Sequence, residues 1–364
     1  MRIPVAIVSA AALLVLGPAA AASAAPPPSG PTTLAQGLVS PLHVSGGPGK
    51  DVSVSQEFQS KLTTFDNWSS ATVYEAPGWD VAGSDYRGST LYFLESQGAG
   101  PEDPRPLAGS LKSIHGRGTV STVTDQIGAY ETTNNADAGA HYGLSDADVA
   151  AHPQCVAQLA ALQFPTSYTG EVDSHPYALT VAGNVAYVAD AGMNAVLAVN
   201  LTTGAIRTVA VLPPRPTVIS AQAGTSLGIG ACVGLTYVFE PVPTDVEVGP
   251  DGWLYVSSLP GGPEDASLGA RGAVFRVAPA TGQTQVFVDN LVTPTGLAFD
   301  GRGNLYVASL FGPGILKVAA GSHTASLFLS AVMAADVDVS GSTLYATTNA
   351  LDEDTGGTLI SLKL

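Results

Sequence analysis

Charged residues, and basic ones above all, are scarce in this sequence of 364 residues, and their scarcity excludes several classes of function. Only 12% of the residues are charged, and 14 Lys and Arg stand against 30 Asp and Glu, which gives a net charge of −16 at pH 7. Because no basic patch is evident, we expect no binding to nucleic acid or to anionic membranes. The acidic balance would favour cations or cationic partners, but it also serves solubility alone.

Cysteine is almost absent as well. Cys155 and Cys232 are the only two, which is too few for a structural zinc site with four ligands from cysteine alone. In an exported chain, two cysteines predict one disulfide between them.

Long hydrophobic runs are missing except at the N-terminus. Residues 3–16 are almost wholly apolar, follow Arg2, and lead to small residues that end at Ala25. This pattern predicts a signal peptide over residues 1–25, cleaved after Ala24 or Ala25. The run is short for a membrane helix, and no later run reaches that length, so we expect a secreted protein without a membrane span. A Pro-rich spacer follows at residues 26–31.

Motifs that would fix a reaction are also lacking. The sequence has neither a His-Glu-x-x-His motif nor a phosphate-cradling loop. Gly224 to Gly228 matches the G-x-S-x-G pattern, but it lies in a Gly-rich stretch rather than between a strand and a helix. The fold can therefore be predicted with more force than the chemistry.

Glycine and proline are abundant, with 41 and 26 residues, and they punctuate a repeated unit. The unit is clearest over Pro243–Gly282, where short apolar strands alternate with turns such as Gly249–Gly252. Alternating apolar residues and Asp-Gly or Thr-Gly turns are typical of antiparallel strands. We interpret this stretch as one four-stranded blade of a β-propeller.

Six such units can be counted from the second strand of each blade. Two of the intervals, from Val52 to Leu91 and from Leu305 to Leu344, are 39 residues long, close to the period of propeller blades. The six markers are Val52, Leu91-Tyr92, Ala186-Tyr187, Leu254-Tyr255, Leu305-Tyr306 and Leu344-Tyr345.

The two ends of the chain are predicted to share one blade. Residues 34–44 align without a gap on residues 287–297, which contain the end of one blade and the start of the next. A strand around Thr33–Ala35 should therefore complete the C-terminal blade and leave no open sheet edge. The expected fold is all-β, a single six-bladed β-propeller over residues 32–364.

Two segments do not fit the repeat and are predicted to be insertions, at about residues 134–172 and 220–240. The first contains an N-cap pattern at Ser145 and apolar residues at helical spacing up to Leu162, with Pro153 expected to limit or kink the helix. Each insertion contains one cysteine. A disulfide between Cys155 and Cys232 would therefore tie the insertions together.

The candidate site lies at the mouth of the propeller channel, where the first strand of each blade begins. Aligning these starts places His43, Asp80, Asp245 and Asp336 around one opening, with His175 three residues before its own slot. Three carboxylates and an imidazole could hold a divalent cation, calcium or another. The alternative is a water-filled channel in which the Asp side chains cap strand starts, so no cofactor is certain.

Acidic residues also crowd the loops predicted on the same face. Those loops connect the second and third strands of their blades, and their carboxylates form a predicted acidic rim. The rim residues are Glu102, Asp103, Glu264, Asp265, Asp352 and Asp354.

The sequence resembles the ScyD/ScyE family, exported propellers of the NHL type that are named after scytonemin biosynthesis clusters. The likeness rests on the run from Leu254 to Val277, LYVSSLPGGPEDASLGARGAVFRV, and on DSHPYA at Asp173–Ala178. The resemblance implies the fold and export, but no catalytic residues. This chain has His175 where the family pattern leads us to expect Asn.

Two functions from different classes follow. The first is a noncatalytic binding or scaffold module that presents the mouth face to a small molecule or an extracellular protein, as a monomer. The second is a metal-assisted hydrolase or lyase like the lactonases and strictosidine synthases, which share six-bladed rings. The second depends on His43, Asp80, Asp245 and Asp336.

Overall fold

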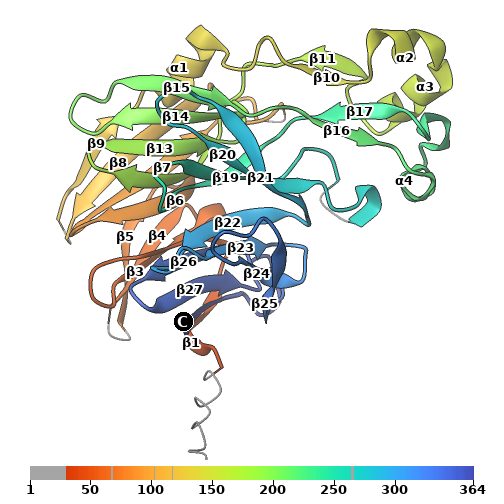
Figure 1. Cartoon of the computed structure of the whole chain (residues 1–364). Coiled ribbons are helices and arrows are strands. Elements are labelled where there is room, and N and C mark those ends of the chain that lie inside the picture. The colour runs from red at the N-terminus through yellow and green to blue at the C-terminus, as the bar shows by residue number, and fades with distance from the viewer. Residues whose placement is uncertain (1–29, 67–68, 102, 117, 264–265) are drawn as a thin grey trace, which may run out of the picture.

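The computed structural model describes residues 30–364 except 67–68, 102, 117 and 264–265. The predicted signal peptide and most of the Pro-rich spacer lie outside these residues. Among the described residues, no helix has the length and apolar character needed to cross a membrane. The described chain forms seven four-stranded antiparallel sheets (Figure 1), which confirms the prediction of an all-β propeller fold.

Six of these sheets are blades arranged in a ring. Their first strands, β2, β6, β12, β18, β22 and β26, contact one another in a closed cycle. The first three blades are β2 (Pro41–Gly46), β3 (Val52–Gln56), β4 (Lys61–Asp66), β5 (Ser69–Glu75); β6 (Asp80–Arg87), β7 (Thr90–Gln97), β8 (Ala108–His115), β9 (Val120–Thr124); and β12 (Pro176–Ala182), β13 (Val185–Asp190), β14 (Ala195–Asn200), β15 (Ile206–Val211).

The other three blades continue the cycle back to the start of the chain. They are β18 (Pro243–Val248), β19 (Leu254–Ser258), β20 (Gly272–Val277), β21 (Thr284–Leu291); β22 (Pro294–Phe299), β23 (Leu305–Ser309), β24 (Gly314–Val318), β25 (Ala325–Ser330); and β26 (Asp336–Ser340), β27 (Thr343–Thr348), β28 (Gly357–Lys363), β1 (Thr32–Leu38). In the last blade β1 pairs antiparallel with β28, Thr32 opposite Ser361. The predicted closure by an N-terminal strand is therefore present.

Each interface between neighbouring blades encloses its own apolar cluster. Between the first two blades, for example, Leu62 of β4 packs with Phe93 of β7 and Ile114 of β8, all of them buried. The alternation in the sequence explains this packing, because every second residue of a strand points to the same face. The turn after β18 shows the local chemistry: Asp251 accepts a hydrogen bond from the Trp253 N–H at 3.1 Å, and Gly252 has a φ of 76°.

The seventh sheet is built by the insertions and lies outside the ring. It pairs β10 (His141–Gly143) and β11 (Ser167–Thr169) with β16 (Arg215–Val218) and β17 (Thr236–Phe239). Figure 1 shows it projecting to one side of the propeller. The helices near it are α2 (Asp146–Ala151), α3 (Pro153–Ala161) and α4 (Ala221–Ser226), whereas α1 (Ile127–Asn134) packs against β8 of the second blade. The 3₁₀ turns are η1 (Glu57–Gln59), η2 (Gly230–Cys232) and η3 (Ala266–Leu268).

The predicted helical segment is split in two. Ser145 caps α2 by accepting a hydrogen bond from the Asp148 N–H at 3.1 Å. Pro153 occupies the first turn of α3, where a missing N–H costs no intrahelical bond. Proline therefore starts a second helix rather than kinking one.

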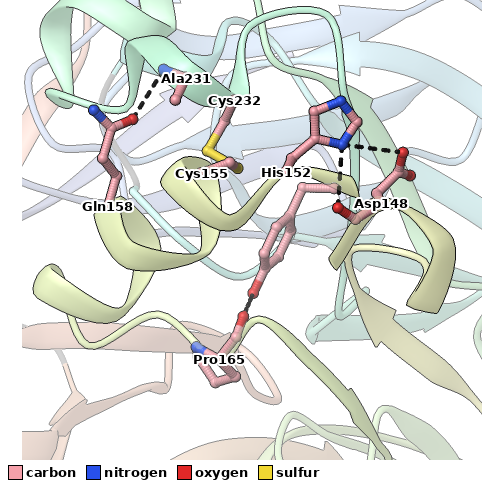
Figure 2. Close-up of a disulfide and its surroundings, with 8 residues drawn as sticks. Asp148, His152, Cys155, Gln158, Pro165, Ala231 and Cys232 are labelled. Carbon is pink, nitrogen blue, oxygen red and sulfur yellow. Dashed lines mark hydrogen bonds and ion pairs between the residues drawn. A yellow bond between two sulfur atoms is a disulfide. The ribbon is translucent and has the colours of Figure 1, made fainter. Parts of the chain in front are cut away.

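The predicted disulfide is confirmed. It joins Cys155 of α3 to Cys232 of η2, with the Cα atoms 4.8 Å apart. Both residues are fully buried in an apolar cluster that includes Leu144 and Ile219. The Gln158 side chain accepts a hydrogen bond from the Ala231 N–H at 2.9 Å and supports the same contact (Figure 2).

Candidate functional site

The channel of the ring contains two levels of ionisable side chains. The upper level lies at the mouth, where the loops from one blade enter the first strand of the next. The lower level lies deeper between the first strands. The predicted residues divide between them: His43, Asp80 and His175 surround the upper level, whereas Asp245 and Asp336 belong to the lower one.

The upper level is centred on Glu57, a residue that the sequence analysis did not select. One oxygen of its carboxylate lies 3.4 Å from His43 Nε2, and the other lies 3.7 Å from His175 Nε2. His175 Nε2 is also 3.9 Å from an Asp80 oxygen. One carboxylate thus stands between two imidazoles, with a second carboxylate beside the outer one.

A repeated backbone hydrogen bond positions Glu57 and His175. In each case the N–H of a residue just after the second strand donates to the C=O of a residue just before the first strand of the same blade. In the first blade Glu57 donates to Ser40 at 3.1 Å, and in the third blade Ala191 donates to His175 at 2.8 Å. Leu259, Leu310 and Ala350 occupy the position of Glu57 in three other blades. The carboxylate therefore stands where the repeat otherwise places an apolar side chain.

The Tyr177 ring packs against both imidazoles in edge-to-face geometry, with its centroid 4.5 Å from that of His43 and 5.5 Å from that of His175. His43 and Glu57 are almost fully buried, whereas the His175 side chain is 24% exposed and that of Asp80 38%. The site is thus closed on the His43 side and open to solvent at His175 and Asp80.

Several polar atoms at this level have no hydrogen-bond partner among the described residues. They are His43 Nε2, His175 Nε2 and Glu57 Oε2. Buried polar atoms are normally satisfied, and unpaired ones cost about 1–3 kcal/mol each. Imidazoles and a carboxylate at these distances can exchange protons with a ligand. In acid–base sites the hydrogen bonds between such groups are often long when no substrate is bound.

Asp80 has a different place from the one predicted. Ser84 pairs with Phe93 as Val246 pairs with Val256, so Gly83, not Asp80, takes the position equivalent to Asp245. Asp80 lies three residues earlier, as His175 does in the next blade. Partial burial raises the pKa of Asp80, which nearby His175 lowers and Glu57 raises further. Asp80 therefore belongs with the histidines.

In the lower level, carboxylates bridge neighbouring blades. Asp245 accepts a hydrogen bond from the Leu297 N–H of the next blade at 2.6 Å, and Asp336 accepts one from Val44 at 2.7 Å. The second oxygen of each accepts a hydrogen bond within its own strand, from the N–H of Val246 and of Val337 respectively. These hydrogen bonds correspond to the alternative given in the sequence analysis, in which the Asp side chains cap strand starts instead of binding a metal ion.

The lower level also holds three acidic residues that the alignment did not select, Asp85, Glu247 and Asp338. Asp85 accepts from Val181 at 2.6 Å and Asp338 from Gly46 at 2.5 Å, so they bridge blades in the same way. Glu247 differs, because it accepts a long hydrogen bond of 3.5 Å from the Thr180 hydroxyl. A signal was present for two of them: Glu247 and Asp338 stand two residues after the aligned Asp245 and Asp336, on the same face of their strands. Asp85 stands two residues after Gly83, the true equivalent of Asp245.

Burial of these carboxyls shifts their proton affinities. Burial raises the pKa of both Asp85 and Asp245 to about 7. Burial, together with the charges of its neighbours, Asp245 first, raises the pKa of Glu247 well above its ordinary value. The same causes raise the pKa of Asp336. The lower level therefore retains protons at pH values where exposed carboxyls are ionised.

The space between these carboxyls is small. The cavity they line has a volume of about 20 Å³, room for about one water molecule. Within the described part of the chain, no three His, Cys, Asp or Glu side chains are arranged to hold a metal ion. The space between these carboxyls is therefore too small for an organic ligand.

The predicted acidic rim is only partly described, since Glu102, Glu264 and Asp265 lie outside the described residues. Asp103 forms an ion pair with Arg105, at 2.9 Å from its Nε. Asp352 accepts hydrogen bonds from the Thr355 hydroxyl at 2.7 Å and from its N–H at 3.1 Å, and Asp354 is exposed. Asp103 and Asp352 thus stabilise their own loops.

Comparisons with known proteins support the fold. No protein-family model matches the chain, and no curated protein matches it. A Bacteroides thetaiotaomicron protein of unknown function has a TM-score of 0.57 at 11% identity, over 92% of this chain and 72% of that one. A Xanthomonas campestris gluconolactonase has a TM-score of 0.54 at 14% identity, over 91% and 88%.

A third solved structure, the PQQ-bound aldose sugar dehydrogenase of Streptomyces coelicolor, has a TM-score of 0.52 at 13% identity, over 91% of this chain and 96% of that one. At such identities the likeness shows a β-propeller and leaves the chemistry to the site.

Proposed function

We propose that this protein is an exported propeller enzyme that uses the upper level of its channel for acid–base chemistry, as a hydrolase or lyase of a small molecule. The observation that carries the proposal is the Glu57 carboxylate placed between the imidazoles of His43 and His175. His175 is the catalytic residue, because it is the imidazole open to solvent. Glu57 orients it, as carboxylates do for catalytic histidines.

His43 and Asp80 have supporting roles in this proposal. His43 contacts the Glu57 oxygen that faces away from His175 and packs against the Tyr177 ring. Asp80 lies 3.9 Å from the same His175 Nε2 that faces Glu57 and can receive or hold a proton there, because partial burial raises its pKa. The nucleophile of a hydrolase would be water, and a lyase would need only proton transfer.

The cation suggested by the sequence fits this site less well than proton transfer does. The described residues offer no group of three ionisable side chains with metal-binding geometry. Asp245 and Asp336 already use both oxygens for backbone hydrogen bonds. The proposed chemistry therefore uses protein side chains.

Export and family are part of the same proposal. The buried disulfide indicates an oxidising compartment, and the apolar N-terminal run of the sequence is typical of a signal peptide. Residues 254–277 and 173–178 support a ScyD/ScyE-like protein. Within that pattern His175 replaces the expected Asn, so this chain carries a proton-transfer group that the pattern does not require.

A substitution at His175 tests the proposal. The wild-type protein and His175→Asn would be assayed with p-nitrophenyl acetate and a hexono-δ-lactone, across pH 5–9. We expect turnover by the wild type above the buffer rate, and a loss of at least about 100-fold in His175→Asn and Glu57→Gln. His141→Asn, which removes an exposed histidine of the insert sheet, is the matched control.

Equal rates for the wild type and His175→Asn would refute the catalytic role. The second candidate is the noncatalytic binding module, as a monomer, for a small molecule or an extracellular protein. It is favoured by Phe58, which follows Glu57 and is 69% exposed. That function predicts binding that Phe58→Ala weakens, without turnover of either probe by the wild type.

A further inference from the structure

A separate set of buried acidic residues lies outside the channel, where α1 leads into the insert sheet. Glu131 is on the last turn of α1 and is fully buried, and Asp137 follows the helix and is 2% exposed. Asn135 stands between them as the C-cap of α1, with a φ of 38° and its N–H bound to the Glu131 carbonyl. None of the three was selected from the sequence.

In each of these side chains one polar atom forms a hydrogen bond and one oxygen has no partner. Glu131 Oε2 accepts from the Ala136 N–H at 3.1 Å, and Asp137 Oδ2 accepts from the Tyr142 hydroxyl at 2.8 Å. Asn135 donates its amide N–H to the Gly170 carbonyl at 3.1 Å. The other oxygens, Glu131 Oε1, Asn135 Oδ1 and Asp137 Oδ1, have no hydrogen-bond partner among the described residues.

The backbone brings the three side chains together. The Glu131 carboxylate folds back onto Ala136, the residue between Asn135 and Asp137. Gly170 closes the other side: it receives the Asn135 amide, and a Cβ built on it would lie 2.1 Å from Asp137 Oδ1. The absence of a side chain at Gly170 thus makes room for the Asp137 oxygen.

The charges around this cluster are of one sign. The carboxyls of Asp190 and Asp137 lie near Glu131, and the carboxyl of Asp173 lies near Asp137. Among the described residues, neither Glu131 nor Asp137 forms an ion pair with Lys, Arg or His.

We propose that Glu131 Oε1, Asn135 Oδ1 and Asp137 Oδ1 bind a calcium ion. Calcium prefers carboxylate and amide oxygens and tolerates irregular geometry, with water completing its shell. The set holds two carboxylates and an amide, so it is not one of the groups of three ionisable side chains sought in the channel. A buried water could donate to only two of the three oxygens and would leave both charges uncompensated.

The ion would join the insert sheet to the third blade. The Asp137 oxygen that does not bind it accepts a hydrogen bond from Asn194 of that blade at 2.9 Å. In the same blade Asp190 accepts the His175 N–H at 2.8 Å. The proposed calcium ion therefore has a structural role. Whether it binds does not depend on the chemistry proposed for His175.

Calorimetric titration of the EDTA-treated full chain with calcium chloride tests the site. We expect one calcium per chain and a melting temperature that rises with calcium concentration. Glu131→Gln and Asp137→Asn should weaken calcium binding at least 10-fold. Asn135→Ala should do so with less risk to the fold, and Asn134→Ala, an exposed neighbour on the same helix end, should leave the affinity unchanged.

The proposal is overturned if the wild type shows neither heat of binding nor a change in melting temperature with calcium. It is equally overturned if Asn135→Ala and Asn134→Ala bind calcium like the wild type. Asp245→Asn locates the ion: loss of calcium binding in this channel variant, with retention in Asn135→Ala, would place the ion between the blades instead.

Discussion

Replacing Glu247 by Gln should stabilise the protein increasingly as the pH rises. Glu247 lies among four other channel carboxyls, and burial followed by their charges raises its pKa well above the ordinary value. The folded protein then holds a proton on Glu247 that the unfolded chain releases above pH 4.3 or so, the ordinary Glu value. The stability that this proton contributes is complete below that pH and is lost as the pH rises, so the carboxyl weakens the fold at neutral pH.

The magnitude follows from the linkage. One proton held only by the folded state costs at most about 1.4 kcal/mol per pH unit, so between pH 5 and 7.5 the limit is about 3 kcal/mol. Because the effective dielectric of such sites moderates the interaction, we expect Glu247→Gln to gain about 1–2 kcal/mol relative to the wild type over this interval. For a chain of this length, that corresponds to about 1.5–3 °C in melting temperature.

Urea unfolding of both proteins at pH 5 and pH 7.5 measures the effect. Glu75→Gln, the same change at an exposed position on β5, is the control and should show no such dependence on pH. A glutamine can still accept the Thr180 hydrogen bond. A Glu247→Gln protein that is less stable than the wild type at pH 7.5 would refute the reasoning, because it would mean that the charge is compensated there.

Three further predictions follow from the packing. Replacing both Cys155 and Cys232 by Ser should cost about 4 kcal/mol in urea unfolding, since the bridge closes a span of 77 residues; an unchanged midpoint would contradict this. Gly296→Ala should lower the free energy of unfolding by about 1–3 kcal/mol, because the new Cβ would lie 2.1 Å from Asp336 Oδ1. A Cβ at Gly301 would meet no atom within 4 Å, so Gly301→Ala should leave the free energy of unfolding nearly unchanged in the same measurement. Deleting residues 30–38 should destabilise the fold by at least about 3 kcal/mol and cause self-association on gel filtration, since Leu38 loses its packing and β28 its partner; a monomer of wild-type stability would argue against closure by β1.

The blades could be predicted because their residues repeat. Pro41, Pro243 and Pro294 each begin the first strand of a blade. The alignment of residues 34–44 on residues 287–297, which matches Pro41 with Pro294, located the closing strand. The insert sheet gave no comparable signal. Its strands β10 and β11 have three residues each, and β10 pairs with β17, far along the chain. Alternation over three residues is too short to indicate a strand.

The site was predicted in part for the same reason. His43 and His175 lie in or beside repeated slots, and the alignment found them. Asp80 was placed in the wrong slot, because its strand lacks the initial proline and its register shifts between Val81 and Ser84. Glu57 follows a second strand instead of preceding a first one, so the alignment of strand starts does not include it. A charged residue in a position otherwise held by Leu or Ala is nevertheless a signal in the sequence.

The pairing of β1 with β28 also has a consequence for the time course of folding. The two strands stand at opposite ends of the described chain, so the contact that completes the ring spans nearly all of it. Contacts of such long range are the slowest to form. During synthesis, residues 32–38 emerge long before residues 357–363, with which they pair. The blades between them can form from neighbouring segments, but the ring closes only when residues 357–363 are free to fold.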